Sequence, residues 1–280
     1  MQNKNLSIRR IVNYLNNEQS EGGGFWLPNI QRPFVWSEEQ MARLFDSIMR
    51  EYPISTLLVW KTKEDVKHRK FIDNYRHDVK LSTYFVPDNE RSKLMVLDGQ
   101  QRLQSLYIGL KGSYEGRELY FDVMSGSKVA PEDIRFRFAF KDSNTAVWPW
   151  VRFKDIVFRT NKLDMQIAQG LAKTAPAQLS EDDLETLQLN VARARQEFVN
   201  GDNITYQELD GIDNPDAYET DDIVEIFIRA NSGGTKLGKS DLLFSLLTSS
   251  WDAADGEMES LLEDLNQGGF AFDRDFVLKS

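Results

Sequence analysis

The 280-residue sequence contains no cysteine, and this absence excludes three kinds of site. Without thiols there is no disulfide framework, no thiolate-bound zinc and no cysteine nucleophile. A chain free of disulfides is typical of a reducing compartment, and we expect the cytoplasm. No apolar run approaches the roughly 18 residues that a bilayer-spanning helix needs, so we expect no contact with a membrane.

Histidine is scarce, with two residues in the whole chain. His68 and His77 both lie in the polar, weakly patterned stretch 61–90, which we expect to be a surface excursion carrying both side chains. Histidine is the commonest general base, and nuclease domains of the His-Asn-His type need histidines beside a metal. The sequence therefore offers no such nuclease centre.

Basic residues are outnumbered by acidic ones, 34 Lys and Arg against 44 Asp and Glu, which gives a net charge of −10. Its distribution is uneven: residues 1–150 carry 22 Lys and Arg against 19 Asp and Glu, whereas residues 151–280 carry 12 against 25. This asymmetry favours contact with a polyanion in the first part only. Diffuse DNA binding by the whole chain is not expected, because that mode depends on many basic phosphate contacts.

What the sequence does contain is ample apolar material, with 41% hydrophobic residues, 17 Phe and 6 Trp. Apolar runs followed by turn residues predict strands, and helical spacing after the Ser37–Gln40 capping box predicts a helix. The resulting order indicates a mixed α/β sheet with helices. Strands are expected at 25–30, 55–60, 94–97, 119–123 and 134–140, and an early helix at 6–15.

The pattern becomes helical after Trp148. Ser180 is expected to cap a long helix, and further helices are expected at 222–230, 241–250 and 256–265. We therefore expect two parts: an α/β domain over residues 1–145 and an α-helical subdomain over residues 146–280.

The most informative segment is Leu94–Arg102, where a buried strand meets Asp98, Gly99, Gln100, Gln101 and Arg102 and then a helical apolar pattern. A strand–turn–helix junction presents backbone N–H groups and the positive end of the helix dipole, which suits phosphate. Arg102 adds a fork of donors that matches phosphate geometry. Asp98 would repel phosphate, and it fits this place if it holds a metal ion or orients a water. The alternative is that Asp98 only caps the helix, Gly99 makes the turn and the other polar residues are solvated.

A second polar block, Gln31-Arg32-Pro33, follows the first predicted strand. One interpretation is that Gln31 and Arg32 are solvated while Phe34 and Trp36 are core residues. The other is that Arg32 reaches the same pocket as Arg102, so that two arginines clamp a polyphosphate or the DNA backbone.

Residues 233–240 match the P-loop pattern letter for letter, which makes a P-loop NTPase centred on Lys239 a competing hypothesis. Two features count against it. The apolar run before it shows helical rather than strand spacing, with Ile223, Phe227 and Ala230 recurring on one face. The convincing strand ending in Asp, 94–98, precedes the motif instead of following it.

Three blocks in this order resemble the N-terminal domain of the GmrSD family of modification-dependent restriction enzymes: 27–36, 98–102 and 227–242. The resemblance spans nearly the whole chain and implies a core related to the ParB/sulfiredoxin fold. In that pattern the segment after Ala230 is a helix–loop–helix, in which Asn231 shapes a turn and Asp241 begins the next helix. Both are possible contributors to the site.

The resemblance implies the nucleotide-handling, DNA-sensing half of a restriction or phage-defence system. It implies binding and hydrolysis of a nucleoside triphosphate with a divalent metal, by expectation Mg²⁺. Its partners would be DNA, modified or unmodified, and a nuclease domain or subunit, since the C-terminal nuclease half is not part of this sequence. The implied catalytic residues are Asp98, Gln100, Gln101 and Arg102, with Asp98 at the metal and with Gln31, Arg32, Gly99 and Arg102 on phosphate. A DNA-binding sensor without catalysis remains an alternative.

Overall fold

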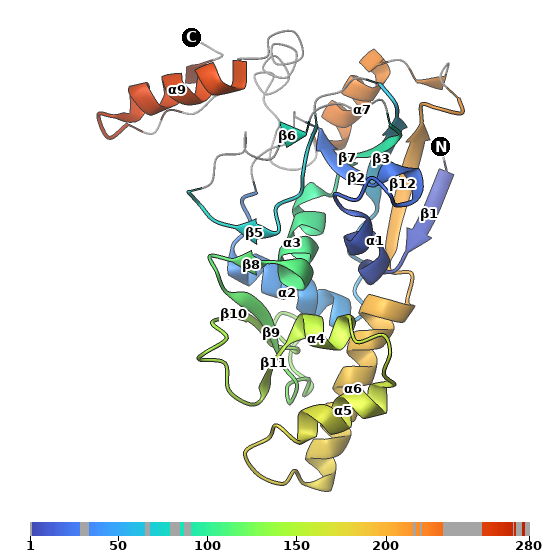
Figure 1. The fold of residues 1–280 in the computed structure, drawn as a ribbon, viewed down its shortest axis with the longest axis vertical. Coiled ribbons are helices and arrows are strands. Elements are labelled where there is room, and N and C mark those ends of the chain that lie inside the picture. Colours follow the sequence, from blue (N-terminus) through green and yellow to red (C-terminus); the bar gives the residue numbers. More distant parts are fainter. Residues whose placement is uncertain are drawn as a thin grey trace.

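The computed structural model describes residues 2–28, 34–64, 68–78, 85–86, 91–214, 217–218, 220–231, 254–270, 272 and 276–277. Its centre is a mixed seven-stranded sheet (Figure 1). The pairs β12–β3 and β7–β2 are parallel, and the other neighbours are antiparallel. The α/β prediction is therefore confirmed. In sheet order the strands are β1 (Gln2–Leu6), β12 (Ile204–Asp210), β3 (Leu57–Thr62), β7 (Lys93–Asp98), β2 (Phe25–Pro28), β4 (His68–Arg69) and β6 (Phe85–Val86).

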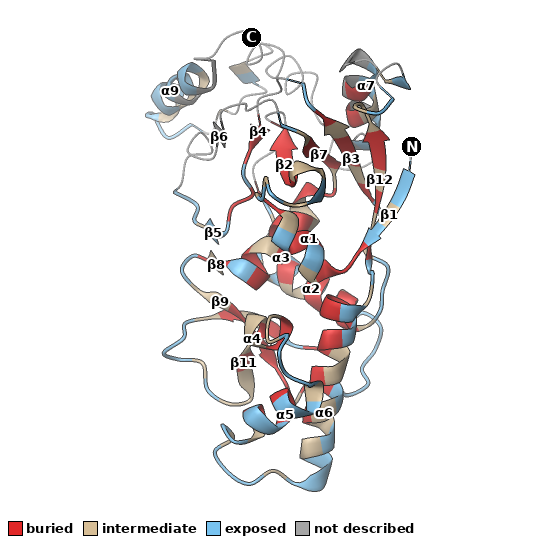
Figure 2. Cartoon of the chain, turned by 45° about the vertical axis from the view of Figure 1, so that its right-hand side comes forward, coloured by how far each residue is buried: buried red, intermediate tan, exposed pale blue. Residues whose placement is uncertain are grey.

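The middle of this sheet is buried on both faces, which explains why its strands are continuous apolar runs. In β7, Leu94 and Val96 belong to one apolar cluster, and Met95 and Leu97 belong to the other. The first cluster includes buried side chains of α1, α2 and α3, whereas the second is closed by α7 (Figure 2). These helices span Ile8–Tyr14, Glu38–Met49, Gln100–Lys111 and Thr220–Asn231, respectively.

The predicted capping box at the start of α2 is present. Ser37 Oγ accepts a hydrogen bond from the Gln40 backbone N–H at 3.3 Å, and the Gln40 side chain accepts one from the Ser37 N–H at 2.9 Å. Two further predicted helices are confirmed as α6 (Glu181–Arg195), capped by Ser180, and α9 (Ala254–Asn266). The helix predicted at 241–250 lies outside the described residues.

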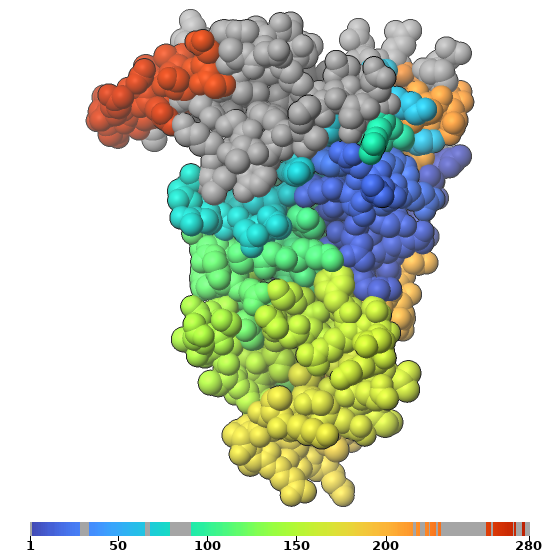
Figure 3. Space-filling view, in the orientation of Figure 1, coloured from blue at the N-terminus to red at the C-terminus, as the bar shows by residue number. Residues whose placement is uncertain are grey.

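A second, three-stranded sheet lies below the first in the view of Figure 1, and helices α2 and α4 contact it. Phenylalanine rings join the parts: Phe45 of α2 stacks on Phe198 at 5.6 Å between centroids, and Phe153 lies edge-on to Phe198 at 4.8 Å. Segments that include α5 and α6 form the lower end of the molecule (Figure 3). The strand order is β10 (Phe138–Lys141), β9 (Glu118–Asp122), β11 (Trp150–Arg152), and the helices are α4 (Phe153–Val157), α5 (Asp164–Ala172) and α6.

The predicted boundary after residue 145 does not coincide with a break in the core. One apolar cluster runs from Leu6 to Tyr206. The chain also returns from α6 to the central sheet, where β12 lies between β1 and β3. Residues on both sides of that boundary therefore build the same sheet.

The stretch 61–90 differs from its prediction. It contributes the end of β3, the short strands β4 and β6, and β5 (Asn74–Tyr75), which pairs with β8 (Ser113–Tyr114). His68, expected on the surface, is 2% exposed, and its ring lies edge-on to Trp26 at 5.1 Å. The prediction for His68 is wrong because a two-residue strand leaves no periodic signal. His77 is exposed as expected, with 69% of its side chain accessible.

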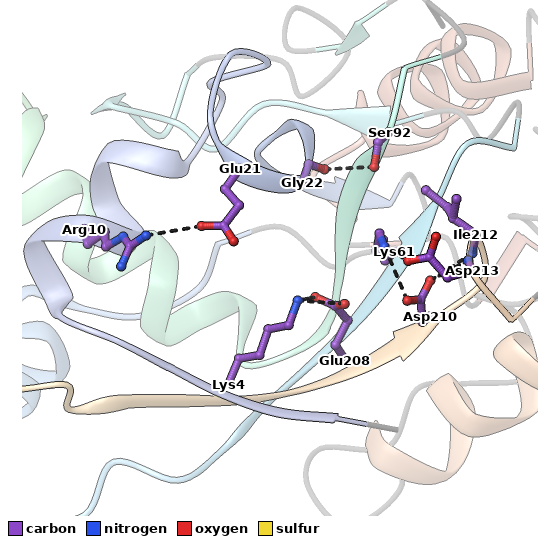
Figure 4. A network of polar contacts seen from close by, with 10 residues as sticks. All are labelled: Lys4, Arg10, Glu21, Gly22, Lys61, Ser92, Glu208, Asp210, Ile212 and Asp213. Carbon is purple, nitrogen blue, oxygen red and sulfur yellow. Dashed lines mark hydrogen bonds and ion pairs between the residues drawn. The ribbon is translucent and has the colours of Figure 1, made fainter.

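Ion pairs connect β12 to both of its neighbours in the sheet, β1 and β3 (Figure 4). Lys4 of β1 pairs at 2.8 Å with Glu208 of β12, which is 2% exposed. Lys61 contacts Asp210 at 3.3 Å and Asp213 at 2.6 Å. Within the described residues, no helix has the length and apolar character needed to cross a membrane.

Candidate functional site at the β7–α3 junction

The strand–turn–helix junction predicted around Asp98 is present. β7 ends at Asp98, Gly99 has φ +91°, and α3 begins at Gln100. The helix has Gly99 as its N-cap with no side-chain cap hydrogen bond, so the interpretation of Asp98 as the cap does not hold. A Cβ on Gly99 would lie 2.2 Å from Leu57 Cδ2, and its φ is one that L side chains rarely adopt. Glycine is therefore required at this turn.

Asp98 and Arg102 face each other across the first turn of α3. Arg102 Nη2 lies 3.5 Å from Asp98 Oδ2, and the side chains are 16% and 39% exposed, respectively. Arg102 also donates to the Ile54 carbonyl and makes a longer contact of 3.5 Å with the Thr56 carbonyl. Burial lowers the pKa of Arg102, while the charge of Asp98 raises it. The guanidinium thus fixes the start of α3 to the segment before β3, with the Asp98 carboxylate beside it.

The two glutamines at the start of α3 occupy different surroundings. Gln100 is 7% exposed, whereas Gln101 is half-buried and its Oε1 accepts a hydrogen bond from the Val35 backbone N–H at 3.1 Å. Val35 comes two residues after the Gln31-Arg32-Pro33 block. Gln101 therefore joins the two sequence blocks that were predicted to converge.

The register of the sheet supports the same convergence. β2 runs parallel to β7, with Phe25 opposite Leu94 and Trp26 opposite Met95. The carboxyl ends of these two strands therefore lie at one edge of the sheet, and ligands of open α/β sheets bind at such edges. Gln31 and Arg32 lie outside the described residues, so their position in a phosphate clamp stays a prediction.

Sequence reasoning missed the side chains that brace this region from behind. Gln104, 1% exposed, accepts from the Ile72 N–H at 3.0 Å and donates to the Ile72 carbonyl. Asn16 binds the backbone of Phe71 in the same way, at 2.7 and 2.8 Å. The two side-chain amides thus bond to the backbone N–H and carbonyl groups of residues 71–72, as a neighbouring strand would. No local sequence pattern predicts these bonds, because the partners are remote in sequence.

Tyrosines and His77 support the segment next to Gln101. Tyr75 donates from its hydroxyl to the Phe34 carbonyl at 3.3 Å and stacks on Tyr114 at 5.2 Å. The His77 ring nitrogens lie 3.2 Å from the Tyr75 hydroxyl and 3.3 Å from the Tyr114 hydroxyl. Burial raises the pKa of both tyrosines, so both hydroxyls stay protonated at neutral pH. Tyr75, which contacts both His77 and Tyr114, is the residue of this group that bonds to Phe34.

The side chains at the junction limit how many ligands the protein could offer a metal ion. In the part of the chain that the structure describes, no three His, Cys, Asp or Glu side chains gather. Mg²⁺ is commonly held by one or two carboxylates together with substrate phosphates and waters. The Asp98 carboxylate, 39% exposed, fits as one such ligand and not as part of an all-protein cage.

The competing P-loop hypothesis conflicts with the structure. The run Ile223–Ile228 belongs to helix α7, whereas a P-loop follows a strand. Residues 233–240, including Lys239, and Asp241 lie outside the described residues, and Asn231 is the last residue of α7. The helix expected before the loop is thus confirmed.

Comparison with known families agrees with this geometry. The profile of the family described as "GmrSD restriction endonuclease, N-terminal domain" matches residues 11–248. The chain belongs to this family. No match was found among curated proteins. As a GmrSD N-terminal domain, the chain is part of a restriction system, and the β7–α3 junction lies within the matched residues.

Proposed function

We propose that this GmrSD domain binds and hydrolyses a nucleoside triphosphate at the β7–α3 junction and thereby regulates DNA cleavage by a nuclease partner. The observation that carries the proposal is the start of α3, a 12-residue helix whose N-cap is Gly99 and which begins beside a carboxylate and an arginine. A helix N-terminus attracts phosphate, and a nearby carboxylate suits a metal or a water.

Each junction residue would have a distinct task. The backbone N–H groups of Gln100 and Gln101 would bind phosphate oxygens, and Arg102 would supply charge to them while holding the Ile54 segment. Asp98 would orient the attacking water, whose oxygen would bond to the γ-phosphorus while the bond from that phosphorus to the β–γ bridging oxygen breaks. The nucleoside diphosphate would leave with the electron pair of the broken bond, and the water proton would pass to a phosphate oxygen or to solvent, giving inorganic phosphate. Mg²⁺, when bound, would neutralise charge on the phosphate oxygens. Positioned charge of this kind is the main source of catalysis in phosphoryl transfer.

The charge distribution suits DNA contact near this site rather than over the whole chain. The basic residues are concentrated in residues 1–150, with 22 Lys and Arg. Gln31 and Arg32 follow β2 in the sequence and would contact phosphate of the nucleotide or of DNA. A core of the ParB/sulfiredoxin type and a separate nuclease domain or subunit complete the proposal.

Phosphate release by purified protein tests the proposal. With each of the four ribonucleoside triphosphates and Mg²⁺, wild-type protein should release phosphate with at least one. Asp98→Asn should abolish release while the circular dichroism spectrum and melting temperature stay near wild type, because Asp98 is partly exposed and its ion pair at 3.5 Å is weak.

Lys239→Ala is the matched control, because it removes a charge from the P-loop-like segment and not from the junction. It should retain wild-type phosphate release. Loss of release in Lys239→Ala with normal release in Asp98→Asn would assign hydrolysis to residues 233–240 and refute the junction.

A further inference from the structure

A cavity lies between the C-terminal end of α2, the loop from β9 to β10 and the end of α6. Its volume is about 610 Å³, and none of residues 98–104 lines it. Sites for small molecules usually have volumes of roughly 300–1,000 Å³. The residues that matter here are Glu51, Gly126, Arg135, Asn190, Arg193 and Glu197.

One wall carries an amide oxygen that accepts no hydrogen bond from a described residue. Asn190 is 6% exposed, and its Nδ2 donates to the Val123 and Ser125 carbonyls at 2.7 and 2.6 Å. These two bonds fix the orientation of the amide. Its Oδ1 accepts no hydrogen bond from the described part of the chain, and the atom itself is accessible rather than buried. A ligand with an N–H donor would supply one.

Arg135 supplies hydrogen-bond donors and a positive charge to the same cavity. Its Nε donates to the Gly126 carbonyl at 2.8 Å, and its guanidinium carbon lies 5.1 Å from the Phe136 ring centroid. No carboxylate of the described residues pairs with it. The two terminal nitrogens are therefore available to an anionic group, which a guanidinium binds as a fork.

The carboxylates that line the cavity are already engaged. Glu51 pairs with Arg193 at 2.6 Å, and Glu197 accepts from Asn203 at 2.7 Å. Asp164 pairs with Arg195, which lies outside the lining. Of the two arginines that line the cavity, Arg193 is paired and Arg135 has no carboxylate partner among the described residues.

Two backbone features keep the cavity open. Gly126 has φ +115°, and a Cβ there would lie 2.8 Å from the Phe136 ring and 3.2 Å from Asn190 Oδ1, in the space before the free acceptor. α6 ends in a π-helical turn, Gln196–Asn200, which supplies three lining residues. Such turns occur frequently at functional sites.

We propose that this cavity binds a nucleoside monophosphate, with its phosphate on Arg135 and an N–H group of its base on Asn190 Oδ1. The site is separate from the β7–α3 junction and does not depend on the hydrolysis proposed there. Inorganic phosphate lacks the N–H donor and a nucleoside lacks the anion, so each alone should bind much more weakly than the monophosphate.

Calorimetric titration of the full chain with AMP, GMP, CMP and UMP tests the proposal, with inorganic phosphate and the matching nucleosides as partial ligands. At least one monophosphate should bind saturably, and Arg135→Gln should weaken it by tenfold or more, as expected for a lost charged hydrogen bond. Leu189→Glu, at a rim residue that is 62% exposed, should weaken it several-fold without a folding risk. Arg43→Gln, at an exposed arginine of α2, is the charge-matched control and should bind like wild type.

Hydrogen–deuterium exchange places the bound ligand. The monophosphate should protect residues 186–200 and 125–136 rather than 98–106, and phosphate release from triphosphates should be unchanged in Arg135→Gln and Leu189→Glu. No saturable binding of any monophosphate, equal binding of inorganic phosphate, or protection confined to 98–106 would overturn the proposal. If Arg135→Gln fails to fold, unchanged affinity in Leu189→Glu together with unprotected 186–200 has the same effect.

Discussion

Gly99 is the residue on which the shape of the junction depends most. Gly99→Ala adds a Cβ 2.2 Å from Leu57 at φ +91°, whereas Gly116→Ala adds one with no atom within 4 Å at φ +76°. Both changes pay for a left-handed backbone, about 1–2 kcal/mol. The clash at Gly99 should add about 1–3 kcal/mol more to its loss of unfolding free energy.

Urea denaturation of the two variants checks this difference, and phosphate release checks its consequence. Gly99→Ala should also lose phosphate release, because the first turn of α3 has to move. Equal destabilisation of the two variants would show that Gly99 is not a close-contact position.

Asp210 gives the fold a defined response to acid. Burial alone would raise its pKa, but hydrogen bonds from the Asp213 and Ile212 backbone N–H groups, with Lys61, lower it to about 2 from the usual 3.8. A carboxylate with a lowered folded-state pKa stabilises the fold above its unfolded pKa. This contribution should therefore be complete above pH 4 and should be lost as the pH falls toward 2.

The measurement is the free energy of unfolding between pH 2 and 5 for wild type and Asp210→Asn. The variant should be less stable at pH 5 and should lose less stability on acidification. Parallel curves for the two proteins would contradict the assigned pKa.

At the scale of single elements, α3 is held from behind by Gln104. Its amide satisfies both the N–H and the carbonyl of Ile72, and both residues are buried. Gln104→Leu keeps the volume but leaves two buried backbone groups unpaired, which should cost about 2–5 kcal/mol of unfolding free energy. Gln188→Leu in α6 is a control, because the Gln188 side chain bonds to no described residue, and it should change stability by less than about 1 kcal/mol.

Chemical denaturation of both variants measures this. A loss below about 1 kcal/mol for Gln104→Leu would mean that water satisfies Ile72 in its place.

Elements whose signal is local could be predicted from the sequence, and elements that depend on remote partners could not. The Ser37–Gln40 box, the strand before Asp98 and the turn at Gly99 are set by residues next to one another. β1 and β4 were missed because each is completed by a distant strand, β12 or β2. At the site, the sequence predicts the junction and its polar residues. It does not show that Arg102 is fixed by the Ile54 carbonyl, because that contact spans 48 positions.

At the scale of the whole molecule, the chain by itself should not cut DNA. A phosphodiester is usually cleaved with a metal held by several ligands and a general base. His68 is buried against Trp26, His77 is engaged with two tyrosines, and no three potential metal ligands gather among the described residues. The acidic residues 151–280, with 25 Asp and Glu, would also repel a duplex.

Incubation of the purified chain with modified and unmodified plasmid, nucleotide and Mg²⁺ checks this expectation. The plasmid should stay supercoiled, and any DNA binding should weaken steeply with salt. Reproducible nicking that disappears in Asp98→Asn would make this chain the nuclease itself.

The central claim is that the start of α3 receives a nucleotide phosphate. A crystal structure of the chain with a non-hydrolysable triphosphate and Mg²⁺ tests it most directly. The account predicts phosphate oxygens within hydrogen-bond distance of the backbone N–H groups of Gln100 and Gln101, with the metal near Asp98. Phosphate seated on residues 233–240, with the first turn of α3 unoccupied, would contradict it.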